Sequence, residues 1–288
     1  MKKLTILLLF LLPIFISSFK KTTFLFDNKD KNIIVHVKDL DLYLDLNDYI
    51  TGVVSAEMPA LFEEEALKAQ AIASRSYAAA SLNNNLIEIT STTNDQAYYP
   101  NYKLKEKWQE DYSKYNIKIK DAVLATNNLV IKRDNKILKT YYFSMSNGYT
   151  ESSQTVFKEN TFESVISPED ETNKNYKVVK TISKEELQKI FNSNDIIIGN
   201  ITRNDTNHID KITINNKEYT GIEIRKLLNL RSTDFTIKEI DKTFEITTIG
   251  YGHGVGMSEY GANYMAKQGS NYKEILKHYY QNTEISEI

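Results

Sequence analysis

Cysteine is absent from all 288 residues of the chain. Disulfide bonds and thiolate metal sites are therefore excluded. Histidine is also scarce: there are four, and His36, His208 and His278 lack the spacing of metal ligands. The sequence thus predicts neither a zinc site nor another cofactor.

No charge of one sign dominates, because 36 basic residues face 38 acidic residues and the net charge is -2. Without a basic field, nucleic acid is not an expected partner. Internal repeats and low-complexity linkers are missing too. The chain does contain a hydrophobic fraction of 41% and 19 tyrosines, which are ample for a packed core. We therefore expect one continuous domain with an elaborated second half.

The N-terminus has the pattern of an export signal. Two lysines precede an apolar run over 4–19, and two lysines follow it. As a helix this run would reach roughly 24 Å, short of the ~30 Å hydrocarbon core unless the flanking lysines snorkel. Residues 1–22 are thus either a cleaved signal or a single-pass anchor in the cell membrane. In both cases 23–288 is expected to be an extracytoplasmic domain.

Short strands and short helices alternate irregularly along the rest of the chain. Without a repeating strand–helix order, the pattern favours an α+β fold around a substrate groove over a parallel α/β sheet. Strands are expected at 32–37, 40–46, 129–133, 137–143, 209–214 and 244–249, and helices at 63–82, 117–126, 184–191, 258–269 and 272–280, with a further short helix opened by the capping box Thr220-x-x-Glu223.

A single carboxylate, Glu57, ends an apolar run immediately before the expected helix 63–82. At an apolar strand-to-helix junction a carboxyl group loses hydration, which raises its pKa. A raised pKa is what a general acid needs near neutral pH. The alternative is a solvated carboxylate that complements the helix dipole. On the helix itself, Lys68 and Arg75 either line a cleft beside Glu57 or pair with Glu64 and Glu65 in solvent.

Two further clusters stand out. The hydroxyls and glycine of 144–153 suit a loop that contacts sugar, and equally an ordinary hydrogen-bonded turn. Alternating glycines surround His253 in 250–262 and would let the backbone approach a ligand closely. This segment lacks the pattern of a phosphate-binding loop. A lone histidine is more often structural than catalytic.

These clusters follow one another in the order of a known family and span nearly all of 23–288. The motifs are Tyr49-Ile-x-Gly52-Val-Val-x-Ala56-Glu57-Met-Pro59, Glu65-Ala-Leu-Lys68-Ala-Gln70-Ala-x-Ala73-x-Arg75-x-Tyr77, Gln96 with Tyr98, Ser144-x-Ser146-x-Gly148-x-Thr150-Glu151, Leu230-Arg-Ser-Thr-Asp-Phe235, Gly252-His-Gly-Val-Gly-Met-Ser258, and Ile275-Leu-x-His278-Tyr-Tyr280. The chain therefore resembles the stage II sporulation protein D family.

The resemblance implies a membrane-anchored lytic transglycosylase that acts on peptidoglycan during engulfment of the forespore. It also implies a preference for glycan strands stripped of peptides by an amidase, and a complex with that amidase and a third membrane protein. The family's catalytic glutamate matches Glu57. Substrate-binding roles are expected for Lys68, Arg75, Gln96, Tyr98, Ser144, Ser146, Gly148, Thr150, His253, Gly254, Ser258 and Tyr260.

One carboxylate suffices for this reaction, whereas ordinary glycosidases need two. The C6 hydroxyl of N-acetylmuramic acid attacks its own C1 and leaves a 1,6-anhydro product. We expect Glu57 to donate a proton to the glycosidic oxygen and then to accept the C6 hydroxyl proton. The C6 hydroxyl lies within the same sugar as C1, so it replaces water as the nucleophile.

The chain departs from the family at three positions. Asp95 precedes Gln96 where some relatives carry a zinc-binding cysteine, so we expect that metal site to be missing. Phe143 replaces a histidine, and Glu259 replaces a glutamine. The added carboxylate would either shift pKa values or act as a second acid/base group.

Two alternative functions stay open. A hydrolytic muramidase would pair Glu57 with Glu259 or Glu151, and an amidase enhancer or glycan-binding module would not cleave at all.

Overall fold

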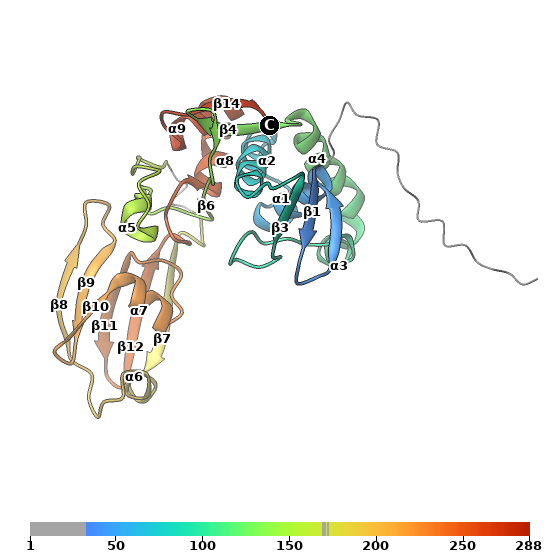
Figure 1. The fold of residues 1–288 in the computed structure, drawn as a ribbon. Helices are drawn as coiled ribbons and strands as arrows, with labels where there is room; N and C mark the ends of the chain where they lie inside the picture. Colours follow the sequence, from blue (N-terminus) through green and yellow to red (C-terminus); the bar gives the residue numbers. More distant parts are fainter. Residues whose placement is uncertain (1–32, 169–170, 172) are drawn as a thin grey trace, which may run out of the picture. The chain divides into compact units, whose positions relative to one another are not determined.

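The computed structural model describes residues 33–168, 171 and 173–288, all within one compact unit, Asn32–Ile288 (Figure 1). Short strands and helices are mixed along the chain, which confirms an α+β fold. The expected signal or anchor, 1–22, lies outside the described residues. Within the described part, none of the helices is both long and apolar enough to span a bilayer.

The described part of the chain opens with a three-stranded sheet ordered β2-β1-β3. Strand β1 (Ile34–Val37) pairs antiparallel with β2 (Leu42–Asp45) and parallel with β3 (Leu86–Ile89). The first two strands were predicted at 32–37 and 40–46, and the structure confirms both with shorter bounds.

Helix α1 (Leu46–Glu57) occupies the apolar run that we expected to be a strand before Glu57. That prediction is wrong because Asp45 caps the helix, accepting a hydrogen bond from the Asn47 amide at 2.9 Å. The apolar residues of the run then fall on one buried face at helical spacing. Glu57 is consequently the last residue of a helix.

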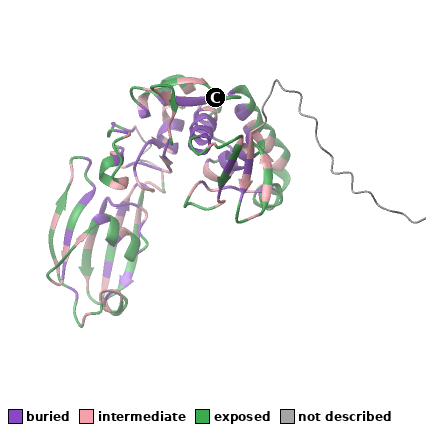
Figure 2. Ribbon diagram, in the orientation of Figure 1, coloured by how far each residue is buried: buried purple, intermediate pink, exposed green. Residues whose placement is uncertain are grey.

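Helix α2 (Glu64–Ala79) is almost entirely buried, as the purple ribbon in Figure 2 shows. It packs against α1, α4 (Tyr112–Ala125), α8 (Glu259–Lys267) and α9 (Tyr272–Tyr279). The small side chains of Ala66, Ala69 and Ala73 are buried and leave room for these neighbours. The main hydrophobic core therefore forms around α2.

The remaining elements around α2 are short. Strand β4 (Leu129–Arg133) pairs with β5 (Lys136–Ile137) and β14 (Glu284–Glu287). The expected hairpin partner 137–143 is only partly correct, because β6 (Tyr142–Phe143) instead pairs in parallel with β13 (Met257–Ser258). The chain also forms α3 (Asn101–Trp108), the 3-10 turn Gln109–Asp111, and α5 (Ser153–Phe157).

Residues 177–249 build a second hydrophobic core of their own, around Ile212, Phe235 and Phe244. Two three-stranded sheets, β10-β9-β8 and β11-β12-β7, contribute to it. The elements are β7 (Lys177–Ser183), α6 (Lys184–Phe191), β8 (Ile198–Arg203), β9 (Ile209–Ile214), β10 (Lys217–Thr220), α7 (Gly221–Leu227), β11 (Phe235–Ile240) and β12 (Thr243–Ile249). The predicted capping box is present, with the Glu223 amide donating to Thr220 Oγ1 at 3.2 Å.

Arg75 is a structural residue at the centre of the main core. Its guanidinium donates to the carbonyl oxygens of Thr126 at 2.8 Å, Leu129 at 3.1 Å and Val123 at 3.1 Å. These bonds hold α2 against the end of α4 and the start of β4. Lys68 lies elsewhere on α2 and pairs with Glu64 and Glu65, at 2.7 Å and 2.9 Å.

Replacing Arg75 with methionine should lower the free energy of unfolding by about 3 kcal/mol or more, because buried carbonyls lose charged donors. Denaturant titration measures this loss. Lys68→Met is the matched control on the same helix and should cost about 1 kcal/mol or less, as partly exposed ion pairs do. Equal losses in the two variants would contradict the structural role of Arg75.

Candidate active site

A cavity of about 680 Å³ has Glu57 in its wall. Its lining comes from α1, α2, α5, β6, α7, α8 and several loops, so both halves of the sequence contribute. The lining residues are Glu57, Tyr77, Thr93, Asn94, Asp95, Lys139, Tyr141, Tyr142, Phe143, Ser144, Phe157, Arg225, Asn229, Leu230, Tyr251, Gly252, His253 and Glu259.

Glu57 is half-buried, and its carboxylate accepts a hydrogen bond from the Ala97 amide at 3.1 Å. Burial raises the pKa of Glu57 to about 7, against the opposing effects of the Ala97 hydrogen bond and the positive charge of Lys107. Lys107 lies on α3 and donates to the carbonyl oxygen of Ser55 at 3.0 Å. At neutral pH a large share of Glu57 therefore carries a proton that it can give away.

Besides Glu57, the cavity wall holds the carboxyl groups of Asp95 and of Glu259, the first residue of α8. Glu259 is the more deeply buried of these two. Only 2% of the residue is exposed, and its Oε1 has no hydrogen-bond partner among the described residues. Burial raises the pKa of Glu259 well above its usual value, and the charge of Glu57 raises it further. A helix start normally favours a negative charge, but complete burial outweighs that effect here. Because the described residues provide neither a counter-charge nor a partner for Oε1, burial favours the protonated form of Glu259.

His253 is held as a neutral imidazole. Its Nδ1 accepts a hydrogen bond from the Val255 amide at 3.0 Å, which assigns the ring proton to Nε2. Burial, helped by the charge of Arg225, lowers the pKa of His253 to about 4. The ring packs against Phe157 and Phe143, at centroid distances of 5.1 Å and 5.8 Å. His253 therefore serves as a fixed wall of the cavity and does not shuttle protons at neutral pH.

Two glycines allow this placement. Gly252 has φ +129°, and a Cβ there would lie 2.6 Å from Phe143 Cβ. Gly254 has φ +85°, and a Cβ there would lie 2.8 Å from Glu151 Cγ. The glycine-rich segment is thus required for close packing against β6 and the loop after it.

Tyrosine and phenylalanine side chains make up much of the wall, and sequence reasoning did not identify them as site residues. They come from α2, the segment around β6, α5 and the loop before His253. Flat aromatic faces with polar tips suit a ligand built of rings and hydroxyls. The set is Tyr77, Tyr141, Tyr142, Phe143, Phe157 and Tyr251.

Among the predicted substrate-binding residues, Ser144 and His253 share the cavity with Glu57. The structure places the others outside its lining, and most of them support the walls from behind. Gln96 is buried and links Tyr49 to Tyr142, through bonds of 3.2 Å and 2.7 Å. The residues outside the lining are Lys68, Arg75, Gln96, Tyr98, Ser146, Gly148, Thr150, Gly254, Ser258 and Tyr260.

Backbone contacts explain several of these positions. Thr150 Oγ1 accepts from the Val165 amide at 2.9 Å, and the carbonyl of Gly148 accepts from the Ser167 amide at 2.8 Å. The Ser146 hydroxyl donates to the carbonyl of Ser167 at 3.3 Å. These bonds fix the loop after β6.

Ser258, Tyr260 and Tyr98 contact protein groups as well. The Ser258 hydroxyl caps α8 by accepting from the Gly261 amide at 3.1 Å. The Tyr260 ring meets Phe62 edge-on at 4.9 Å, and the Tyr98 ring stacks on Tyr49 at 5.5 Å. Their described contacts stabilise α8 and α1, the two helices that carry the carboxyl groups of the cavity.

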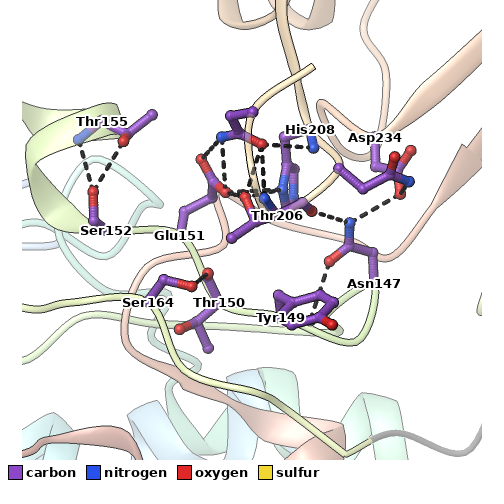
Figure 3. Close-up of polar contacts among 12 residues, drawn as sticks. Asn147, Tyr149, Thr150, Glu151, Ser152, Thr155, Ser164, Thr206, His208 and Asp234 are labelled. Carbon is purple, nitrogen blue, oxygen red and sulfur yellow. Dashed lines mark hydrogen bonds and ion pairs between the residues drawn. The ribbon is translucent and has the colours of Figure 1, made fainter.

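Glu151 belongs to a separate buried network, drawn in Figure 3. Its carboxylate pairs with His208 Nδ1 at 2.9 Å and accepts hydrogen bonds from Asn204 Nδ2 and the Thr206 hydroxyl. Beside it, Asn147 donates to Asp234 at 2.9 Å. Glu151 is committed to these partners and is not part of the cavity lining, which leaves Asp95 and Glu259 as the carboxyl groups that share the cavity with Glu57.

Fold and site together define an α+β protein with an aromatic-lined cavity and a carboxyl group whose pKa burial raises to about 7. Comparison with known proteins gives the family. A family model described as Stage II sporulation protein matches residues 39–132. Stage II sporulation protein D of Bacillus amyloliquefaciens is 39% identical over 255 residues, covering 84% of this chain and 74% of that protein.

Stage II sporulation protein D of Bacillus subtilis is 38% identical over 255 residues, and the match covers 84% of this chain and 74% of that protein. The chain therefore belongs to the stage II sporulation protein D family. A more distant relative, the amidase enhancer of Bacillus subtilis, is 25% identical, and the match covers 82% of this chain but 40% of that protein.

The raised pKa of Glu57 makes the free energy of unfolding depend on pH. The folded pKa, about 7, lies above the unfolded value, 4.5, so the folded state binds the proton more tightly. The contribution of Glu57 is fully present below pH 4.5 and is lost as the pH rises through 7. Glu57→Gln should therefore unfold like the parent at pH 4 but be more stable at pH 8, by at most about 3 kcal/mol.

Denaturant titration across this pH range measures the difference. Glu163→Gln makes the same substitution at an exposed position and controls for the loss of a charge. A Glu57→Gln variant that tracks the parent at every pH would show that Glu57 is not desolvated.

Proposed function

We propose that this protein is a peptidoglycan lytic transglycosylase of sporulating cells. It would cleave the bond between N-acetylmuramic acid and N-acetylglucosamine and leave a 1,6-anhydro-muramoyl end. One observation carries the proposal: burial in the cavity wall raises the pKa of Glu57 to about 7, which suits a general acid, and burial also favours the protonated form of Glu259. The names of the relatives support a role in sporulation.

Glu57 would act as acid and then as base. In the first half-reaction its proton passes to the glycosidic oxygen as the bond from that oxygen to C1 breaks. In the second, the C6 oxygen of the same sugar forms a bond to C1, and its proton passes to the Glu57 carboxylate. Glu57 is then protonated again, so the cycle closes without water or a second catalytic residue. The nucleophile is already part of the bound sugar, which replaces a bimolecular step with an intramolecular one.

Glu259 favours this mechanism over hydrolysis. A hydrolytic glycosidase needs its second carboxyl group ionised, as a nucleophile or as the base that activates water. Burial raises the pKa of Glu259 well above its usual value and so disfavours the ionised form that a base requires. A neutral carboxyl group has the size and charge of an amide and would add no base to the site.

Glu57→Gln should lower the release of anhydro-terminated fragments from purified glycan strands by about a thousandfold, the range that general acid catalysts contribute. Glu259→Gln should retain activity within about threefold, because an amide replaces an uncharged acid of the same size. Mass spectrometry of the digests measures both the amount and the chemistry of the new ends.

Other outcomes separate the alternatives. Reducing ends, formed by addition of water, that the parent releases and Glu259→Gln does not would favour the hydrolytic muramidase. Strand binding without cleavage, equal in the parent and in Glu57→Gln, would favour a binding role like that named in the amidase enhancer relative.

The rate should also fall with rising pH. Protonated Glu57 starts the reaction, so kcat/KM should be level below pH 7 and drop about tenfold per pH unit above it. Lys107→Met removes the positive charge that lowers the pKa of Glu57, so the falling limb should move to higher pH. Lys103→Met is the matched control, because Lys103 also lies on α3 and over the Tyr99 ring, at 4.6 Å. A rate that rises through pH 7 would contradict the acid role.

The cellular setting of the proposal follows the family. The protein would be held at the cell membrane by residues 1–22, with 23–288 outside the cytoplasm at the septum between mother cell and forespore. Its partners would be peptidoglycan strands, a sporulation amidase and a third membrane protein of the engulfment complex. Neither nucleic acid nor a cofactor is proposed.

A further inference from the structure

Arg225 places a guanidinium group in the wall of the cavity that holds Glu57. The residue is half-buried, and its Nε–H donates only a long hydrogen bond, 3.4 Å, to the carbonyl of Leu230. Among the described residues, Arg225 has no carboxylate within ion-pair distance. A guanidinium partly removed from water and left without an anion is costly, which points to an anionic ligand.

Four other residues with a carboxyl or ammonium group line the cavity. Asp95 accepts hydrogen bonds from the Thr90 amide and hydroxyl at 2.9 Å and 2.7 Å. The Lys139 ammonium lies over the Tyr77 ring at 4.9 Å. Glu57 and Glu259 are the protonatable pair described above. Among the described residues, Arg225 and Lys139 are thus the cations of the wall without an ion pair, and Arg225 is the more buried of the two and carries the planar guanidinium fork.

Arg225 and Glu57 line the cavity from different elements, α7 and α1. A ligand that contacts both residues would present an anionic group to Arg225 and the oxygen of the bond that breaks to Glu57. Next to Arg225, Asn229 adds a polar side chain and Tyr251 an aromatic ring to the same wall.

The second hydrophobic core holds Arg225 in place. The helix that carries it, α7, begins at a capping box and buries Ile224 in that core. At its first residue, Gly221, an added Cβ would lie 2.1 Å from the carbonyl oxygen of Ile209. This close packing against β9 gives the guanidinium a rigid base, as a specificity-determining residue requires.

The muramoyl unit of the proposed substrate carries one anion of suitable chemistry. Its lactyl ether ends in a carboxylate when no peptide is attached and in a neutral amide when a peptide is attached. The planar guanidinium fork matches a carboxylate with two parallel hydrogen bonds. Resting on the proposed function, we propose that Arg225 binds the free lactyl carboxylate of a muramoyl residue and makes the cavity selective for carboxylate over amide.

The test measures binding of the full chain in its Glu57→Gln form, which holds strands without cutting them. The probes are peptide-free glycan strands with free lactyl carboxylates and the same strands after conversion of those groups to primary amides. The protein with Arg225 should bind the carboxylate strands about tenfold to a hundredfold more tightly, as a charged hydrogen-bonded pair provides. Arg225→Gln should bind both strands equally, and Arg225→Lys should retain part of the difference.

Lys226→Gln is the matched control, because it removes the same charge from the next, exposed residue of α7. It should retain the full preference. A preference that survives Arg225→Gln, or that Lys226→Gln weakens equally, would overturn the carboxylate site. So would the absence of any preference in the protein with Arg225.

Cleavage by the parent separates this inference from the proposed function. Release of anhydro ends at equal rates from both kinds of strand would overturn the carboxylate site and leave the transglycosylase standing. A carboxylate preference that depends on Arg225, without cleavage of either strand, would support the carboxylate site and overturn the transglycosylase proposal.

Discussion

Packing of α1 against α2 removes water from the carboxyl group at the end of α1, and the chemistry of the cavity depends on that desolvation. Helix α1 buries Tyr49, Ile50, Val53 and Val54, so its last turn arrives at the cavity already inside the core. One backbone amide, that of Ala97, and one partly buried lysine are the groups that favour the charged form of Glu57. They are too few to restore an ordinary pKa, so the residue sits between its two protonation states near neutrality.

The sequence was most informative where local chemistry decides the structure. The cap at Thr220, the amphipathic helices 184–191 and 272–280, and the alternating strand 209–214 depend on near neighbours, and the structure confirms them. The run before Glu57 was read wrongly because a short apolar segment suits a strand or a helix equally, and the cap at Asp45 decided between them. The desolvation of Glu57 was nevertheless expected, since either element would end it in an apolar setting.

Most of the cavity wall was beyond the reach of the sequence. Tyr77, Tyr141 and Phe157 are separated along the chain and carry no motif, and only the packing of α2, β6 and α5 brings them together. Conversely, several motif residues that were predicted to bind substrate instead stabilise the elements around the cavity. Arg75 and Gln96 are residue types that often bind ligands, yet in the structure both donate hydrogen bonds to other protein groups. A sequence shows the residue type but not whether the side chain bonds to the protein or to a ligand. Only the hydrogen-bond partners in the structure distinguish the two roles.

The parallel pairing of β6 with β13 sets Tyr142 beside Met257 and Phe143 beside Ser258. The chain therefore returns beside the point from which it left, and residues 177–249, which build the second core, form one excursion between these two strands. An excursion of this kind can be lengthened, shortened or exchanged without displacing the residues at its base. Evolution could thus remodel the part of the protein that carries Arg225 as a cassette, while the acid at Glu57 and its partner at Glu259 keep their places.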